Sequence, residues 1–452
     1  MRRRSFLLAC GTAAVSTAWQ GAAQTSLGTL AWAESGGLWI RELPDGRPVK
    51  VASGDGLHAP RISPSGRWIA YRNREDKVSV ARRDGQAGAS FESEGSVWFP
   101  REDRLAVMHA ESVAVFGPND NWKAPVALLK GATLPVFAPG GNRFVFGRDF
   151  DSVTGPDGFS ATGQICLASL SAPDSKPEVL AANPEGGVEP YGWTRDGKSI
   201  LYWSADEWSG SLWNDGVELF AVAAEGGQPR KLGVATLVHD DMLDLAPQSG
   251  GNRLAVTSGD GSNTWAGKRI AVVNLETGAL WSLTADDIAA ISPAWSPDGH
   301  RIAYVAAPDA DVAYRKSMAG ANIRIMRPDR TIETKVVTPD MRIGPGGGEE
   351  AHRFLHQRKI WLLEPEGSGK PHQLTSDARY RDEEPMWSAD GRQILFGRMD
   401  YDGHPSLWLM ESDGSAPVQV CKLHVFDALE DQDSWFGFYG YTDWRDAFDW
   451  RQ

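Results

Sequence analysis

Two histidines in one polar stretch of the chain have a spacing that metal sites use. A helix over residues 349–358 would place His352 and His356 one turn apart, as metal ligands on helices often are. Arg353 stands where a metallopeptidase motif has its Glu. A solvated helix that packs its apolar residues against the protein explains the same pattern. We therefore expect no resident cofactor, with His352 and His356 as the candidates should a divalent metal bind.

Acidic and aromatic side chains recur in three other places, where they could form a binding surface. Aromatic rings stack on sugars, and carboxylates bind cations or basic peptides. Ordinary surface acids, on a chain with a net charge of −13, are the alternative interpretation of each residue. The candidate binding residues are Asp206, Glu207, Trp208, Trp213, His239, Asp240, Asp241, Arg379, Asp382 and Glu383.

The elements that must position these side chains are copies of one repeat. SPAWSPDGHRIAYVA at 292–306 is interpreted as strand, tight turn and strand. Pro297 presets the turn, Asp298 accepts hydrogen bonds from the backbone that follows, and Gly299 takes the positive φ that closes a hairpin. Related segments occupy 60–71, 97–107, 135–146, 191–203, 243–256 and 385–396. Copies at spacings from about 36 residues upward are typical of four-stranded propeller blades.

This repeat resembles the WD40-like PD40 motif of TolB-type β-propellers. The resemblance covers residues 28–426 and implies an all-β propeller of four-stranded blades. Strands over 29–53 form a blade that lacks its first strand, so the seven repeats give eight blades if the end of the chain supplies that strand. Seven blades is the alternative, because VWFPREDRLAV at 97–107 could be an irregular hairpin rather than the start of a blade.

The C-terminal segment, 427–452, is expected to close the ring, roughly through residues 435–444. A ring must close on itself or leave an exposed strand edge. Eight aromatic residues lie between Trp435 and Trp450, and together they would expose a larger apolar patch than soluble monomers normally carry. We expect them to be buried, and we expect a monomer.

Residues 1–23 have the pattern of an export signal peptide, with a basic start, an apolar run and small residues before the exit. Arg3 and Arg4 also resemble a twin-arginine signal, so a periplasmic or extracellular protein is expected, exported by that route or by the general one. The acidic charge makes nucleic acid and anionic membranes poor partners. No later apolar run could span a bilayer. Cys166 and Cys421 are expected to be separate thiols.

Long links join the second and third strands of four blades. Blade geometry places these links on one rim of the ring, together with the links between blades, and the Ser-Pro-Asp-Gly turns on the other. Insertions confined to one face of a repeat array usually mark its binding face. We therefore expect an exported, non-enzymatic propeller that binds a protein or glycan partner on this face. The long links are 149–163, 203–217, 258–268 and 306–358.

The alternative function is a metal-dependent polysaccharide lyase or a glycosidase-like propeller enzyme. Oligogalacturonate lyase, a propeller enzyme that this chain resembles in fold, needs a metal held by several histidines, and His239, His352, His356 and His404 could share the elaborated face. The sequence has no G-x-S-x-G elbow, and no catalytic residue is assigned. Three or more converging histidines, or a carboxylate pair in the central channel, would favour the enzyme.

Overall fold

The computed structural model describes residues 26–424 and 437–452 with short gaps. The predicted export signal therefore lies outside the described residues. The gaps are residues 76, 94, 110–111, 126, 149–152, 155–159, 173–174, 207–214, 248, 250, 260, 262, 328–329, 339–340, 342–343, 345–348, 368–369 and 438.

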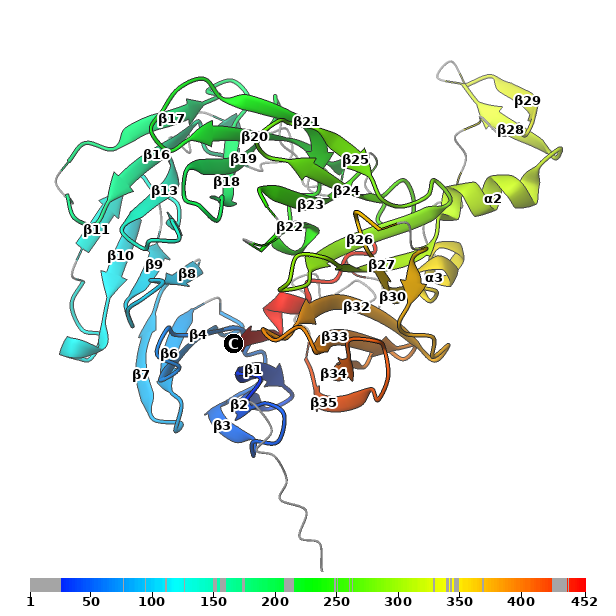
Figure 1. Cartoon of the computed structure of the whole chain (residues 1–452). Coiled ribbons are helices and arrows are strands. Elements are labelled where there is room, and N and C mark those ends of the chain that lie inside the picture. Colours follow the sequence, from blue (N-terminus) through cyan, green and yellow to red (C-terminus); the bar gives the residue numbers. More distant parts are fainter. Residues whose placement is uncertain are drawn as a thin grey trace, which may run out of the picture.

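The chain forms eight four-stranded antiparallel blades around a common centre (Figure 1), with the first strand of each blade innermost. Blades 5 and 6 are further joined into one sheet through Thr236 opposite Ser258. The prediction of an all-β propeller with eight blades is confirmed. The alternative of seven blades is wrong, because residues 97–107 contribute to the first two strands of blade 3.

The strands of blades 1 to 4, from the inner to the outer strand, are β36 (Phe448–Arg451), β1 (Thr29–Glu34), β2 (Gly37–Glu42) and β3 (Val49–Ser53); β4 (His58–Ile62), β5 (Trp68–Arg72), β6 (Val78–Arg82) and β7 (Ala87–Phe91); β8 (Gly95–Trp98), β9 (Leu105–His109), β10 (Ser112–Phe116) and β11 (Ala127–Lys130); and β12 (Val136–Phe137), β13 (Arg143–Arg148), β16 (Gln164–Ser169) and β17 (Glu178–Ala182).

The strands of blades 5 to 8, in the same order, are β18 (Val188–Trp193), β19 (Ser199–Ser204), β20 (Val217–Ala223) and β21 (Arg230–Thr236); β22 (Leu243–Leu245), β23 (Arg253–Ser258), β24 (Arg269–Asn274) and β25 (Leu280–Ser282); β26 (Ile288–Trp295), β27 (Ile302–Pro308), β30 (Lys359–Leu363) and β31 (His372–Gln373); and β32 (Tyr380–Trp387), β33 (Gln393–Asp400), β34 (Pro405–Glu411) and β35 (Val418–Lys422).

Nine short elements lie outside the blades in the described part of the chain. Within that part, no helix is long and apolar enough to cross a membrane. The elements are β14 (Val153–Thr154), β15 (Ser160–Ala161), β28 (Asn322–Met326), β29 (Ile332–Val336), α2 (Ala310–Met318), α3 (Glu349–Leu355), η1 (Pro118–Asp120), η3 (Asp240–Met242) and η5 (Trp444–Asp446).

The repeated turn closes the first hairpin of blades 7 and 8 as its residue types predict. The carboxylate of Asp298 accepts hydrogen bonds from the Ser296 hydroxyl (2.5 Å) and from the backbone N–H of His300 (3.0 Å). Gly299 has a φ of 73°, which favours glycine. The same pattern recurs at Asp390 in blade 8. Local turn chemistry therefore sets the register of the first two strands in these blades.

The tryptophans at the ends of inner strands join neighbouring blades. Trp193 of β18 donates its indole N–H to the carbonyl of Val136 in the preceding blade (2.9 Å), and Trp387 of β32 donates to Ala294 in the same way (3.0 Å). Both rings are buried. These residues are part of the core, as their place in the repeat predicts.

The ring closes through the last strand of the chain. β36 pairs antiparallel with β1, with Trp450 opposite Leu30, and it supplies the inner strand that blade 1 lacks. The predicted closing segment, 435–444, is wrong in position. Residues 439–447 first cross the insertion-bearing face, as the contacts below show, and the strand begins only at Phe448.

The two cysteines of the described chain are separate thiols, as predicted. Cys166 lies on β16 of blade 4 and is buried, whereas Cys421 lies on β35 of blade 8 and is partly buried. They belong to blades on different sides of the ring (Figure 1).

Candidate functional site at the channel mouth

Side chains from several blades and from the end of the chain meet at the centre of the insertion-bearing face. The hydrogen bonds and charge interactions described below connect them. We call this group the channel mouth, and it consists of Glu189, Tyr191, His239, Asp240, Asp241, Asp244, Ser292, Glu384, Tyr441, Asp443 and Arg445.

Three inner strands have a bulge at the same position. In each, the residue before a proline has a positive φ: Ala59 (47°) in β4, Ser292 (52°) in β26 and Glu384 (50°) in β32. This conformation costs a residue other than glycine about 1–2 kcal/mol and persists where surrounding contacts fix it. For Ser292 and Glu384, one such contact is the carboxyl group of Asp241.

Asp241 is the centre of the hydrogen-bond network. It lies in η3, on the link between blades 5 and 6, and only 6% of its surface is exposed. One oxygen accepts a hydrogen bond from the Ser292 hydroxyl (3.1 Å), and the other accepts one from the Tyr441 hydroxyl (2.9 Å). Its third partner is the carboxyl group of Glu384. Asp241 therefore connects blades 7 and 8 and the C-terminal segment to its own link.

Glu384 is a buried acid whose charge is only partly balanced. Its side chain accepts a hydrogen bond from Nε of Arg445 (2.6 Å), and 3% of its surface is exposed. Burial raises the pKa of Glu384 to about 8, helped by the negative charge of Asp241 and opposed by Arg445. A proton is therefore held between the two carboxyl groups at neutral pH.

Among the described residues, no cation forms a hydrogen bond with the remaining acids of the channel mouth, although the charges of Arg195 and Arg445 act on Asp244 and that of Arg61 acts on Asp443. Burial, with the charge of Asp240, raises the pKa of Glu189 to about 7, and burial raises the pKa of Asp244 to about 6. Desolvation and the charge of Asp241 raise the pKa of Asp443, whose side chain still reaches solvent. Asp240 is exposed. The channel mouth therefore favours the arrival of positive charge.

His239 is held as a neutral ring in this group. It stacks on Tyr441, with ring centroids 4.0 Å apart and an angle of 21° between the ring planes. Burial lowers the pKa of His239 to about 4, although Asp443 and Asp240 oppose this change. At neutral pH this histidine therefore adds no positive charge to the acids around it.

Residues 439–447, which we call the strap, cross from blade to blade before the final strand. The carbonyl of Tyr439 accepts from Thr264 N–H (3.1 Å), and the carbonyl of Gly440 accepts from Arg358 (2.6 Å). Further along, the carbonyl of Ala447 accepts from the N–H of Ala33 (2.8 Å). The strap is therefore attached to blades 6, 7 and 1, and it presents Tyr441 and Arg445 to the channel mouth.

A buried ion network under the strap fixes its position. Glu383 pairs with Arg358 (2.6 Å) and Arg381 (3.1 Å), and it accepts a hydrogen bond from the indole N–H of Trp444 (2.9 Å). The Trp444 ring lies against Gly397, where an added Cβ would come within 2.6 Å of it. Losing one partner of such a network is costly, because it leaves a buried charge unpaired.

The predicted binding residues fall into three groups. His239, Asp240 and Asp241 meet at the channel mouth. Asp206 and Arg379 are exposed outside it, and Arg379 is ion-paired with Asp377 (2.7 Å). The remaining five are buried in β32 or lie outside the described residues.

The predicted position of Asp382 and Glu383 on a surface link is wrong, because both residues lie inside β32. Asp382 is fully buried and accepts a hydrogen bond from Arg398 (2.6 Å), so both carboxylates are structural. Glu207, Trp208 and Trp213 lie outside the described residues.

His352 and His356, the two histidines with metal-site spacing, do not form a metal site in the described structure. α3 forms within the predicted helix, but it ends at Leu355. The His356 ring stacks on Tyr401, with centroids 3.7 Å apart and planes at 8°. Burial lowers the pKa of His356 to about 4, and the charge of His352 makes a smaller contribution in the same direction. Among the described residues, His239, His352 and His356 belong to no group of three or more side chains that could hold a metal ion.

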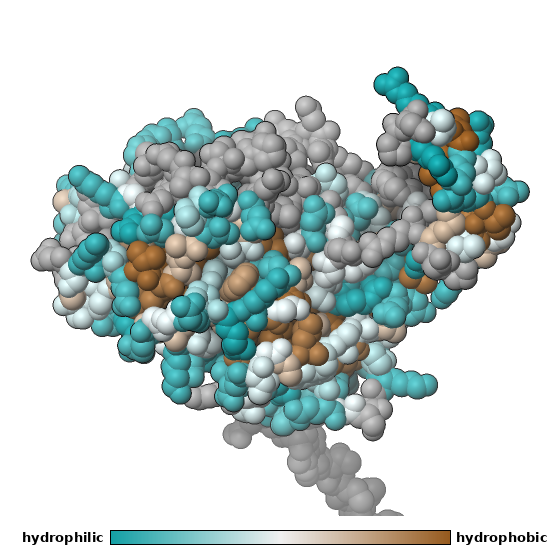
Figure 2. Space-filling view, turned by 90° about the horizontal axis from the view of Figure 1, so that it is seen from above, coloured by the Kyte–Doolittle hydropathy of each residue, from teal (hydrophilic) through white to brown (hydrophobic). Residues whose placement is uncertain are grey.

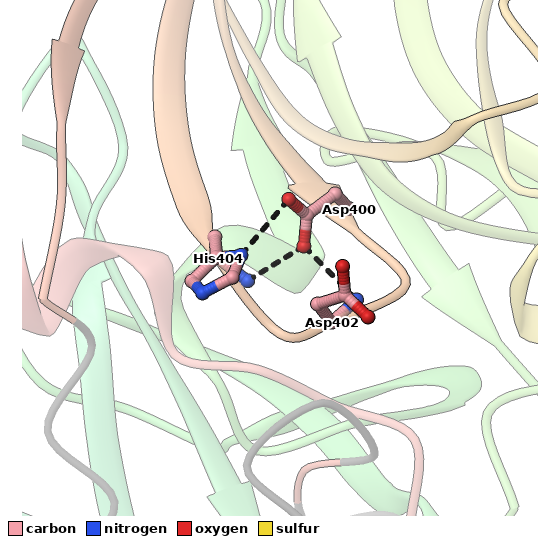
Figure 3. A group of neighbouring side chains, drawn as sticks. All are labelled: Asp400, Asp402 and His404. Atoms are coloured by element: carbon pink, nitrogen blue, oxygen red, sulfur yellow. Dashed lines mark hydrogen bonds and ion pairs between the residues drawn. The ribbon is translucent and has the colours of Figure 1, made fainter.

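The turn between β33 and β34 brings three possible metal ligands together (Figure 3). Asp400, Asp402 and His404 each offer an atom within 4.8 Å of the others. Asp400 accepts hydrogen bonds from the backbone N–H groups of Asp402 (3.0 Å) and His404 (2.9 Å), and its carboxylate lies 3.0 Å from the His404 ring nitrogen. These bonds are those of a side chain that closes its own turn, so we assign no metal to this turn.

Sequence reasoning missed eight residues of the channel mouth: Glu189, Tyr191, Asp244, Ser292, Glu384, Tyr441, Asp443 and Arg445. A signal for two of them exists in the chain. The residue before the proline of an inner strand, in Ile-Ser-Pro and Glu-Glu-Pro, is the one that the bulge turns towards Asp241.

A scan against protein-family models finds no match, and neither does a search of the curated proteins. Similar solved structures include a dipeptidyl peptidase 4 from Porphyromonas gingivalis, which is 10% identical, with 88% of this chain and 58% of that chain covered and a TM-score of 0.54. A eukaryotic initiation factor is 11% identical, with 88% of each chain covered and a TM-score of 0.51. TolB from Acinetobacter baumannii is 15% identical, with 87% and 63% covered and a TM-score of 0.35. At these identities the likeness is one of fold alone. The strand topology makes the chain a β-propeller of four-stranded blades, as its repeats predict.

Proposed function

We propose that this protein is an exported, non-enzymatic propeller that binds a protein partner on its insertion-bearing face, with a cationic segment of that partner in the channel mouth. The observation that supports this proposal is the set of poorly balanced acids there. The raised pKa values of Glu189 and Asp244, about 7 and about 6, show that their charged forms are disfavoured in the free protein. A Lys or Arg side chain placed beside them would favour those forms.

A protein partner fits this site better than a neutral glycan does. A sugar would supply hydroxyl groups and apolar ring faces, but no positive charge to offset Glu189, Asp244 and Asp443. A basic peptide supplies that charge and also increases the rate of encounter with an acidic surface. The long links on the same face give a partner further surface to contact.

The pair formed by Asp241 and Glu384 is the observation that favours the alternative, a glycosidase-like enzyme. Two neighbouring carboxyl groups are the usual catalytic pair of glycosidases. Here, however, both oxygens of Asp241 accept protein hydrogen bonds, and Glu384 is bound by Arg445. Both side chains are more than nine-tenths buried. Polysaccharide turnover that Glu384→Gln abolishes would make this the better proposal.

The metal-dependent form of the alternative has its own test. Metal analysis of the purified protein, before and after His352→Ala with His356→Ala, asks whether a bound ion depends on this pair. Because the His356 ring stacks on Tyr401, we expect the two preparations to have the same metal content.

The proposal is tested with a hepta-lysine peptide as the probe, titrated into the protein in a calorimeter. Asp240→Asn with Asp443→Asn removes two exposed acids of the channel mouth and should weaken binding about tenfold or more, since a tenfold change is only about 1.4 kcal/mol. The matched control, Asp402→Asn with Asp413→Asn, removes the same charge from exposed acids elsewhere. Equal affinities in the two double variants would contradict a site at the channel mouth.

A further inference from the structure

One part of the molecule projects away from the ring. Residues 310–337, which we call the arm, leave blade 7 between β27 and β30 and consist of helix α2 followed by the hairpin of β28 and β29 (Figure 1). The hairpin is a two-stranded sheet that pairs with no other strand of the described chain. An isolated hairpin of this kind is only marginally stable in water. A contact with another surface would therefore stabilise it.

The hairpin exposes apolar side chains on one of its faces. Met326 is 70% exposed, Ile332 55% and Val336 54%, and apart from Val418 these are the most exposed large apolar residues in the described part of the chain. Met326 lies directly opposite Ile332 in the strand register, and Val336 lies four pairs further along on the same face. Figure 2 shows hydrophobic surface on the part of the molecule that projects beyond the ring. Such a patch usually marks a contact surface.

The arm is cationic, whereas the rest of the protein is acidic. Residues 310–337 contain six Lys or Arg and three Asp or Glu, a net charge of +3, against −13 for the whole chain, so the remainder has −16. Four of these cations are exposed on or beside the hairpin: Arg324, Arg327, Arg330 and Lys335.

We infer that this arm docks in the channel mouth of a second copy of the chain. The inference rests on the proposed function, namely that the channel mouth accepts a cationic protein segment, and it names that segment. The acids around Asp240 and Asp443 and the cations around Arg324 are surfaces of opposite charge on one molecule. A reciprocal exchange, in which each copy inserts its arm into the other, closes into a symmetric dimer.

Charge disfavours two other occupants. Two arms that met edge to edge would each bring a charge of +3, and like charges repel across such a pairing. An anionic membrane would attract the arm, but it would repel the −16 of the remainder and offer no partners to the free strand edges of the hairpin. A dimer departs from the monomer that the sequence analysis expects, so its existence is a direct test.

The first experiment measures mass by light scattering after size exclusion, over a series of protein concentrations. The wild-type protein should reach twice the monomer mass at low salt and dissociate in about 0.5 M salt, where charges are screened within a few ångström. Arg324→Glu, Arg327→Glu and Arg330→Glu together should abolish the dimer. The control reverses three exposed cations on turns of the opposite rim, Arg67, Lys198 and Arg392, and should leave the dimer intact.

The second experiment restores the contact in a mixture of two variants. Asp240→Lys with Asp443→Lys should be monomeric alone, as should the arm variant, yet the two should associate when mixed, because the reversed arm meets a reversed channel mouth. A monomeric wild-type protein at every concentration would overturn the inference, and so would a dimer that the arm variant still forms. The inference also fails if the mixture stays monomeric or if the arm binds anionic phosphatidylglycerol vesicles instead. Hepta-lysine binding tests the proposed function separately, since the peptide binds without a second copy of the chain.

Discussion

Asp241 and Glu384 share a hydrogen bond between two carboxyl groups, although one lies on the link between blades 5 and 6 and the other on the inner strand of blade 8. The pair connects parts of the ring that are 143 positions apart in the chain (384 − 241). Because it holds a proton at neutral pH, its effect on stability depends on pH.

The first prediction concerns that dependence. The pKa of Glu384 rises from 4.5 to about 8 on folding, so the folded state keeps a proton that the unfolded chain loses. This stabilisation is complete below about pH 4.5 and is lost as the pH rises to about 8. The wild-type melting temperature should therefore fall from pH 5.5 to pH 8, and Glu384→Gln should fall less. Asp206→Asn, an exposed acid, should keep the wild-type slope, and parallel curves for all three proteins would refute the shared proton.

The blades could be predicted from the sequence because their determinants are local. The bonds of Asp298 to residues two positions away on either side, and the positive φ of Gly299, need no distant partner. The aromatic density near the end of the chain likewise indicated burial. It could not locate the closing strand, because Trp444 and Trp450 are both buried aromatics and only one of them lies in the strand.

The channel mouth could not be predicted in the same way. Its acids come from distant stretches, and a run such as Arg381 to Glu384 does not reveal which acid is paired with a buried arginine and which faces the channel. Asp382 forms an ion pair with Arg398, and Glu383 forms one with Arg358. By contrast, the bulge at Glu384 turns that side chain towards Asp241. Such assignments depend on long-range contacts that no local pattern contains.

A second prediction tests ring closure. Ending the chain at Ala447 removes β36, and with it the buried side chains of Phe448 and Trp450, each worth about 1.5–3 kcal/mol of transfer free energy. The inner edge of blade 1 would then be unpaired, so this variant should aggregate and melt well below the parent. Removing only Gln452 serves as the control. A monomeric variant with the parental melting temperature would mean that β36 is dispensable.

A third prediction concerns the strap. Trp444→Ala should destabilise the protein by about 3–5 kcal/mol, as large-to-small changes at buried aromatics do, because it empties the space over Gly397 and leaves Glu383 without one donor. Tyr439→Ala, on the same segment but 39% exposed, should cost about 0.5 kcal/mol or less. Urea unfolding of both variants measures the difference, and equal midpoints would show that the strap is not anchored by Trp444.

A fourth prediction concerns export. Cell fractionation should find a shortened chain outside the cytoplasm, because residues 1–23 have the features of a signal peptide. Arg3→Lys with Arg4→Lys should block export only if the twin-arginine route is used. Full-length protein confined to the cytoplasm of the wild-type strain would rule out export by either route.

The most direct test of the proposed function is the affinity for hepta-lysine, measured by calorimetry at pH 5.5 and at pH 8. Between these values Asp244, with a pKa of about 6, and Glu189, with a pKa of about 7, lose their protons in the free protein. Binding should therefore strengthen about tenfold, or about 1.4 kcal/mol, and Glu189→Gln with Asp244→Asn should remove most of that gain. An affinity that is the same at both pH values, or a gain that the double variant retains, would contradict cation binding at the channel mouth.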